Sequence, residues 1–349
     1  MQKNQIRNIG FTIVELLVVI VVIGVLAAIT IISYTGISQR ATISSIQSDL
    51  TNSSQQIKLF QVDNSNYPNS ITDCPTPAAG NMCLKASNGN SYSYGVNNTS
   101  NPQTFCITTT NGNLNYMITP QSTPIVGGCP NYNGLVLFLD AAVPASYPGS
   151  GSTWTDLSGN NSNGTLNSAT YTNTNGGALS FSGVSDSVSI PYAAQFNIRN
   201  AITLSIWIKR TTGFNQTQDT MILGRPPAWF FYDAYNSGNI HGDVYIDTVR
   251  RGALETSVPF DNSWYQVTYT YDSNTHISSI YKNGVLINTN TLTGLSNYLI
   301  DPSTANFQPM GWNSLGRGML LNDALIYNRA LSLAEIQQNF NVLKNRYGL

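Results

Sequence analysis

Glutamate and histidine side chains that could carry out acid–base catalysis are few beyond residue 131, and no Asp or Glu residues lie two positions apart there. The glutamates there are Glu255 and Glu335. A glycosidase needs two carboxylates about 5 to 5.5 Å apart for retention, or about 6.5 to 9.5 Å for inversion. Asp243 and Asp247 share one face of a predicted strand, but four residues at about 3.3 Å each hold them about 13 Å apart. No GxSxG, HExxH or glycine-rich phosphate loop occurs. The sequence therefore predicts a protein that is not an enzyme.

One carboxylate lies where it needs a chemical partner. Residues 11–32 are apolar apart from Glu15, and as a helix they would be about 33 Å long, enough to cross the hydrocarbon layer. Lys3 and Arg7 precede this segment and would keep its start in the cytoplasm. No small-residue cleavage site ends it, as one would in a secretory signal. Because a carboxylate is costly to bury in lipid, Glu15 is predicted to be functional and to meet a cation.

The four cysteines lie in one window and predict covalent cross-links. Their intervals of 9, 23 and 23 residues contain no CxxC pair and no nearby histidine, which disfavours a zinc site. An even number of cysteines favours two disulfides formed in an oxidising compartment, and three connectivities remain open. The residues are Cys74, Cys83, Cys106 and Cys129.

Length and composition limit the number of domains and the classes of function that the chain can have. At 349 residues the chain is long enough for two domains. Charged residues make up 9% of it, against about 25% in ordinary soluble proteins, and the net charge is -1. Such a chain lacks the surplus of cations that nucleic-acid binding requires. With 41% hydrophobic and 10% aromatic residues it can bury folded cores, so disorder is not expected.

The segment GFTIVELLVVIVVIGVLAAI resembles the leader and helix of a type IV prepilin. The resemblance implies that residues 1–10 are a leader peptide and that a prepilin peptidase cuts between Gly10 and Phe11. It also implies methylation of the new amino group of Phe11. Glu15 would then pair with the amino end of a neighbouring subunit's Phe11 inside a filament, which supplies the missing cation.

The rest of the first domain is predicted to be a helix packed on a small sheet. A membrane-spanning and then amphipathic helix is expected over 11–63, and Pro68 in NSNYPNS lies just beyond its end. Alternating runs at 91–96, 104–110 and 113–119 predict antiparallel strands. This α+β arrangement resembles a pilin globular domain over 64–130. The resemblance favours the disulfides Cys74–Cys83 and Cys106–Cys129.

A second, all-β domain is predicted over 131–349, after a Pro- and Gly-rich linker at 119–134. Repeated short strands indicate a jelly-roll sandwich. Asn283 and Gly284 predict a hairpin turn, and Ser332 with Glu335 predicts the cap of a short C-terminal helix. Trp207 and Trp264 lie within alternating apolar strands and are expected to be core residues.

Six motifs in order, from DLSGNNSNGT at 156–165 to DALIYNRALSLAEI at 323–336, resemble laminin-G-like and concanavalin-type lectin and glucanase sandwiches. The resemblance implies a carbohydrate ligand. Calcium often binds in such relatives where the first and last strands pair, which would make Asp140 and Asp323 its ligands; no other cofactor is expected. Aromatic and polar groups suited to sugar binding are Trp229, Tyr235, His241, Trp312 and Arg317.

Together these features predict a minor, adhesin-like type IV pilus subunit. It would be anchored in the cytoplasmic membrane with its N-terminus inside, and would become extracellular in the filament. Its expected partners are other pilins, the prepilin peptidase and methylase, the inner-membrane assembly platform, and a carbohydrate or cell surface. Two alternatives remain: the sandwich is a purely structural decoration of the filament, or the chain is a pseudopilin of a secretion or DNA-uptake system.

Overall fold

The computed structural model describes residues 13–71, 84, 86–99, 103–183, 185–211, 220–234, 238–303 and 318–349. Gly10, Phe11, Cys74, Cys83, Tyr235, Trp312 and Arg317 lie outside these ranges, and so does the side chain of Glu15. Among the described residues, no helix is long and apolar enough to cross a membrane.

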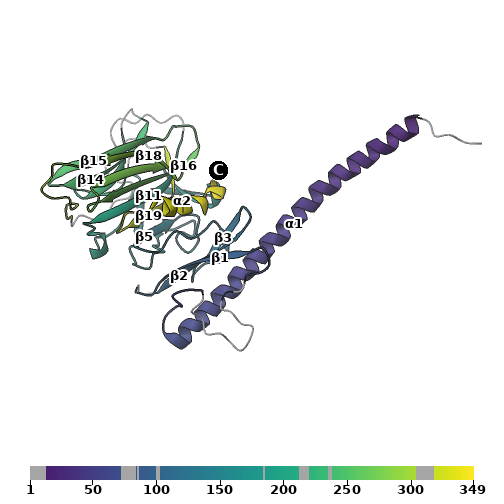
Figure 1. Ribbon diagram of the computed structural model, residues 1–349, viewed down its shortest axis with the longest axis horizontal. Helices are drawn as coiled ribbons and strands as arrows, with labels where there is room; N and C mark the ends of the chain where they lie inside the picture. Colours follow the sequence, from purple (N-terminus) through teal and green to yellow (C-terminus); the bar gives the residue numbers. More distant parts are fainter. Residues whose placement is uncertain are drawn as a thin grey trace, which may run out of the picture.

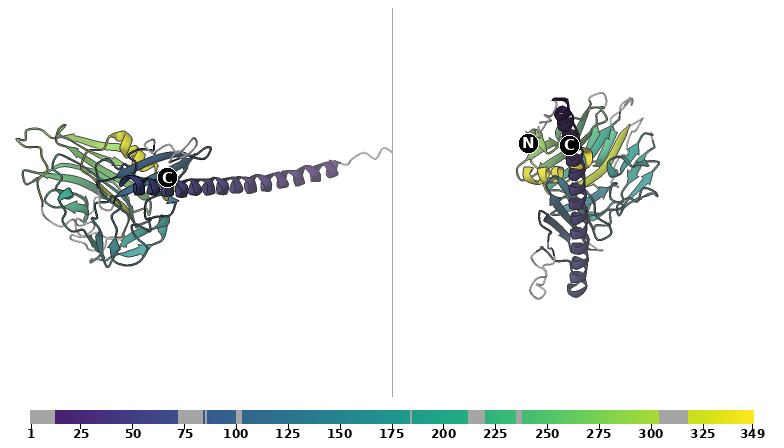
Figure 2. Two further views of the ribbon diagram at one scale, coloured as in Figure 1. Left: turned by 90° about the horizontal axis from the view of Figure 1, so that it is seen from below. Right: turned by 90° about the vertical axis from the view of Figure 1, so that its right-hand side faces the viewer.

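A long helix and a four-stranded sheet form the N-terminal module, residues 13–130. Helix α1 (Ile13–Asn64) projects well beyond the rest of the molecule (Figures 1 and 2). The sheet lies between α1 and the second unit of the molecule, the β-sandwich of residues 135–349. The sheet has the order β1-β2-β3-β4 and is antiparallel. Its strands are β1 (Ser91–Asn97), β2 (Thr104–Asn111), β3 (Leu114–Ile118) and β4 (Ile125–Val126).

The second half of α1 packs on this sheet through one apolar stripe. Ile46, Leu50 and Ile57 are fully buried and lie in one cluster with Phe105 and Ile107 of β2. Their spacing of four and seven residues places them on one side of the helix. The helix ends at Asn64, and the strands agree with the predicted runs to within a residue.

A β-sandwich fills residues 135–349. Its larger sheet follows the order β18-β17-β16-β11-β19-β9-β8, with β5 also paired to β19, and its second sheet follows β12-β13-β14-β15. A three-stranded sheet, β10-β7-β6, lies beside them. The strands of the sandwich are β5 (Leu135–Asp140), β6 (Thr153–Trp154), β7 (Gly164–Asn167), β8 (Thr170–Thr172), β9 (Ala178–Phe181), β10 (Ser187–Ser189), β11 (Ala201–Arg210), β12 (Thr220–Arg225), β13 (Trp229–Asp233), β14 (Asn239–Ile246), β15 (Val249–Ser257), β16 (Trp264–Asp272), β17 (Ile277–Lys282), β18 (Val285–Thr291) and β19 (Met319–Tyr327).

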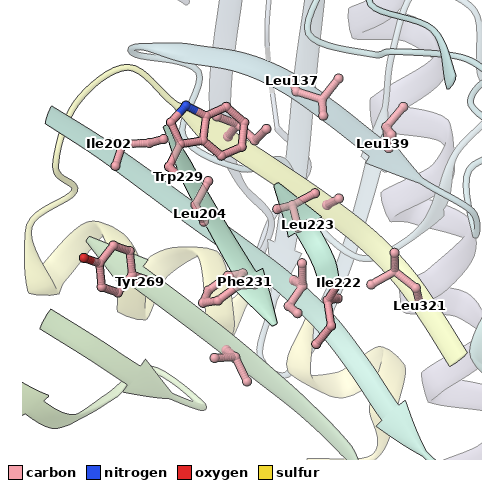
Figure 3. Close-up of a cluster of buried hydrophobic side chains, with 14 of the residues drawn as sticks. Leu137, Leu139, Ile202, Leu204, Ile222, Leu223, Trp229, Phe231, Tyr269 and Leu321 are labelled. Atoms are coloured by element: carbon pink, nitrogen blue, oxygen red, sulfur yellow. The ribbon is translucent and has the colours of Figure 1, made fainter. Parts of the chain in front are cut away.

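The two larger sheets enclose the main core. Figure 3 shows Trp229 and Phe231 of β13 beside Ile202 and Leu204 of β11. Alternate residues of each strand point into this core, as expected when two sheets pack face to face. The predicted jelly-roll sandwich is therefore confirmed.

Two local predictions in the sandwich are also confirmed. Asn283 and Gly284 connect β17 to β18 with φ angles of +51° and +73°, the left-handed values that such a turn requires. Helix α2 (Leu333–Asn341) begins with a capping box, because Ser332 accepts from the backbone of Glu335 and Glu335 accepts from that of Ser332. A 3-10 helix, η3 (Lys344–Tyr347), follows α2.

The C-terminal segment covers the outer face of the larger sheet. Trp207 and Trp264 are buried as predicted, but they lie on that outer face, in a cluster with Leu343 and Tyr347. The ring of Tyr347 stacks on Trp207 with centroids 3.9 Å apart. The C-terminal segment is therefore part of the fold of the sandwich.

The predicted linker is an ordered part of the structure. It contains β4, and residues 127–130 that follow β4 are buried. The disulfide Cys106–Cys129, predicted from the pilin resemblance, joins β2 to this segment with Cα atoms 5.8 Å apart.

Candidate functional site

The outer face of the β12–β15 sheet carries a row of aromatic and charged side chains. Strand pairing places Tyr232 opposite His241, His241 opposite Glu255, and Tyr245 opposite Arg250. Residues directly opposite each other in an antiparallel pair point to the same face. We call this surface the aromatic–cationic face; its residues are Phe230, Tyr232, His241, Asp243, Tyr245, Arg250 and Glu255.

Tyr232 lies at the centre of a stack of flat groups. The ring of Tyr232 stacks on that of His241, with centroids 4.6 Å apart. The guanidinium of Arg250 lies over the ring of Tyr232, 4.6 Å from its centroid. Arg250 also lies 5.4 Å from the ring centroid of Phe230. Stacking and cation–π contacts hold these groups in place. The Arg250 side chain is 40% exposed and that of His241 is 17% exposed, whereas Phe230 is buried.

Two contacts to carboxylates fix the stack at its ends. Arg250 donates to Asp243 at 2.7 Å, and His241 Nε2 lies 2.9 Å from Glu255 Oε2. Asp243 is fully buried, whereas half of the Glu255 side chain is exposed. Burial raises the pKa of Asp243 to about 6, although Arg250 opposes this shift. At pH 7 the buried pair is therefore ionised, and its guanidinium has a fixed position.

Ordinary alternation along β14 places Asp243 on this face, opposite Phe230 of β13. A β-bulge lies across from it in β15, where Gly252 and Ala253 fall between the residues paired with Gly242 and Val244. A Cβ atom on Gly242 would lie 2.5 Å from the ring of Tyr269, so the backbone approaches the core closely here.

The structure corrects one expected ligand-binding residue and places another on the outer face. Trp229 is fully buried and points into the core between the sheets, so its ring is not available to stack on a ligand (Figure 3). His241 lies on the outer face, beside Tyr232. Sequence reasoning missed Tyr232, Tyr245, Arg250 and Glu255, because their place on one face depends on the register of β13, β14 and β15.

Asp140 and Asp323 come together as the calcium resemblance implied, but Asp140 binds a guanidinium. They are register partners on β5 and β19, both fully buried. Both Asp140 oxygens accept from Arg346 Nη1, at 3.0 and 2.8 Å. Burial and the nearby charge of Asp140 raise the pKa of Asp323 well above its usual range. Within the described ranges, no group of three or more His, Cys, Asp or Glu side chains could hold a metal ion.

A cleft of about 560 Å³ lies between the two units, with Gln47 and Tyr116 on one side and Asn175 and Asn345 on the other. Asn175 donates to the carbonyl oxygen of Arg346 at 2.9 Å, and Asn345 donates to that of Asn113. These amide groups already bind the chain's own backbone. We therefore place the candidate ligand site on the aromatic–cationic face.

Comparison with known families agrees with this division of the chain. Residues 7–31 match the prokaryotic N-terminal methylation motif, and residues 181–337 match the concanavalin A-like lectin/glucanases superfamily. The chain carries both a prepilin methylation motif and a lectin-like domain. The motif implies a precursor anchored in the inner membrane and assembled into a filament.

Relatives are similar to the N-terminal part of the chain. Type II secretion system core protein G of Dickeya chrysanthemi is 37% identical over 62 residues, which is 18% of this chain and 40% of that protein. The same protein of Klebsiella pneumoniae is 37% identical over 62 residues, 18% of this chain and 44% of that protein. The match thus spans less than half the length of these relatives. The chain is a type IV pilin-like or pseudopilin-like subunit with a lectin-like domain.

Among solved structures, the botulinum neurotoxin serotype D binding domain has a TM-score of 0.49 and 16% identity, covering 60% of this chain and 52% of that one. The binding domain of Paraclostridial Mosquitocidal Protein 1 also has a TM-score of 0.49, with 17% identity, covering 59% of this chain and 52% of that one.

Proposed function

We propose that this chain is a minor, adhesin-like pilin that binds a glycan or a glycan-bearing surface through the aromatic–cationic face. The observation that carries the proposal is the partly exposed stack of His241, Tyr232 and Arg250 on the outer face of a lectin-like sandwich. Aromatic rings suit the apolar faces of sugars, and the charged groups around them can bond hydroxyls. The role is binding rather than catalysis.

Assembly would follow the prepilin route. The peptidase would cleave between Gly10 and Phe11, the amino group of Phe11 would be methylated, and the assembly platform would move the subunit into the filament. The sandwich is larger than the N-terminal module, so dense packing of this subunit at every filament position is sterically disfavoured. A low-abundance subunit that displays the sandwich fits this bulk.

Removing the ring of Tyr232 is expected to weaken glycan binding about tenfold. Aromatic and cation–π contacts contribute about 1 to 2 kcal/mol at such sites, and 1.4 kcal/mol is a factor of ten. A glycan array probed with the full-length wild-type protein in detergent micelles would identify the best ligand. Titration with that ligand would then compare the affinities of Tyr232→Ala and the wild type. Tyr232→Phe keeps the ring and should retain binding within about threefold.

A blank array for the wild type would instead favour a structural sandwich. Equal affinity of Tyr232→Ala and wild type would move the ligand site away from this face. Unfolding curves for both variants would establish that a lost signal does not come from lost folding.

A secretion role is the second candidate, favoured by the 37% identity to the two secretion-system proteins. In that case the subunit would help a secretion or DNA-uptake system to move its cargo and would not attach the cell to a surface. Deleting the gene would then abolish secretion or DNA uptake and leave surface attachment intact. Loss of attachment with normal secretion and uptake supports the adhesin.

A further inference from the structure

The last residues of the chain bind the last strand of the N-terminal module. Arg346 in η3 donates from Nη1 to Asp140 at 2.8 Å and to Asn322 at 3.1 Å, and from Nη2 to the carbonyl oxygen of Val126 at 3.1 Å. These partners belong to β5, β19 and β4. Burial alone would lower the pKa of Arg346, but the neighbouring Asp140 holds that pKa above its ordinary value. One buried guanidinium thus joins the C-terminus, the sandwich and the N-terminal module.

The backbone after β4 runs directly against the C-terminal segment. A Cβ atom on Gly127 would lie 2.5 Å from Arg346 Nη2, and one on Gly128 would lie 2.5 Å from Val342 Cβ. Real Cβ atoms do not come this close to their neighbours, so only glycine fits here without displacing the segment. The fit at Gly127 and Gly128 depends on the position of residues 342–346.

The two units also share a hydrophobic core. Cys106, Met117 and Cys129 of the N-terminal module belong to one buried cluster with Leu331 and Ile336 of the sandwich. If a flexible linker separated the two units, these side chains would be exposed to water. Interfaces between mobile domains are usually more polar than this buried apolar cluster, so the two units pack as one body.

Hydrogen bonds surround this shared core. The backbone of Asn131 donates to Asn339 Oδ1 at 2.9 Å, and its side chain donates to Glu335 at 3.0 Å. Further along the junction, Asn97 donates to the carbonyl oxygen of Ser158 at 3.0 Å. The bond of Asn97 joins the two units directly, whereas those of Asn131 hold the segment between the units against helix α2.

We infer that residues 342–347 are a C-terminal clasp that makes the N-terminal module and the sandwich one cooperative folding unit. The module completes β4 and the core around Cys129 only when the chain has folded to its last residues. A subunit with a truncated or misfolded sandwich therefore presents an incomplete N-terminal module and is unfit for assembly. This inference does not depend on which ligand the sandwich binds.

Native-state hydrogen exchange on the full chain in detergent micelles tests the clasp. In the wild type, the slowest amides of β3 and β19 should share one opening free energy and one denaturant dependence, because they open together. Distinct values for the two strands would overturn the inference, and this comparison needs no variant.

Arg346→Met provides the second arm, because it leaves Asp140 buried without its partner. Such a loss costs enough to speed exchange by on the order of 100-fold or more. Exchange should accelerate in both β3 and β19. Lys344→Met removes a less buried cation from the same 3-10 helix and should change exchange by less than about threefold. Faster exchange in β19 with β3 unchanged contradicts a shared folding unit.

Discussion

Replacing Glu15 by Gln is expected to abolish filament assembly and leave the chain folded in the membrane. The carboxylate lies four residues after Phe11, in an apolar segment where its charge needs a cation. Under our proposal the amino group of a neighbour's Phe11 would supply that cation, and a neutral amide would attract it far less. Because charges interact strongly in an apolar environment, we expect filament yield to fall at least about 100-fold. Immunoblotting of sheared filaments and of membranes measures both pools.

Glu255→Gln is the matched control, since it makes the same chemical change at an exposed position of the sandwich. It should leave filament yield at the wild-type level. If Glu15→Gln also assembled normally, the pairing of subunits through this carboxylate would be excluded.

Removing the disulfide Cys106–Cys129 is expected to destabilise the protein by about 3 kcal/mol. The bond closes a loop with a sequence separation of 23 residues, and constraining an unfolded chain of this size has about that effect. Both sulfur-bearing residues are also buried in the cluster shared with Leu331 and Ile336, so the loss should weaken the junction of the two units. Denaturant unfolding of a Cys106→Ala/Cys129→Ala variant, monitored by tryptophan fluorescence, measures the change.

Wild-type protein unfolded in the presence of a reductant should approach the stability of the double variant. An unfolding midpoint that neither the substitutions nor the reductant changes would show that the bond contributes little. Fluorescence is informative because the buried Trp207 and Trp264 report on the sandwich side of the junction.

Features with a local cause could be predicted from the sequence. The turn at Asn283–Gly284 and the capping box of Ser332 and Glu335 each depend on residues within a few positions, and both are confirmed. Strands β1 to β3 were also predicted to within a residue, because each alternates and ends at turn residues.

The candidate site is harder to predict, because strand pairing decides which residues of β13, β14 and β15 lie on the outer face. In β13, aromatic residues occupy four successive positions from Trp229 to Tyr232, so alternation alone does not reveal which of them face the core. The register of β14 and β15 comes from a turn at Asp247 and Thr248, with φ angles of +53° and +63°. Threonine seldom marks such a turn, and the bulge at Gly252 and Ala253 of β15 leaves no clear pattern.

The clasp could not be predicted from the sequence. Arg346 and Asp140 are 206 positions apart, and a lone arginine near a terminus resembles any exposed cation. Residues 127–130 were assigned to a linker because glycine and proline usually indicate one. Here Gly127 and Gly128 are needed for close packing against the C-terminal segment.

The most direct test of the account is the mass of the mature subunit in purified native filaments. We predict a chain that begins at Phe11, carries one added methyl group on its amino terminus and retains the sandwich. Intact Met1 in the filament, or a filament-associated form without the sandwich, would contradict a processed pilin that displays a lectin-like domain.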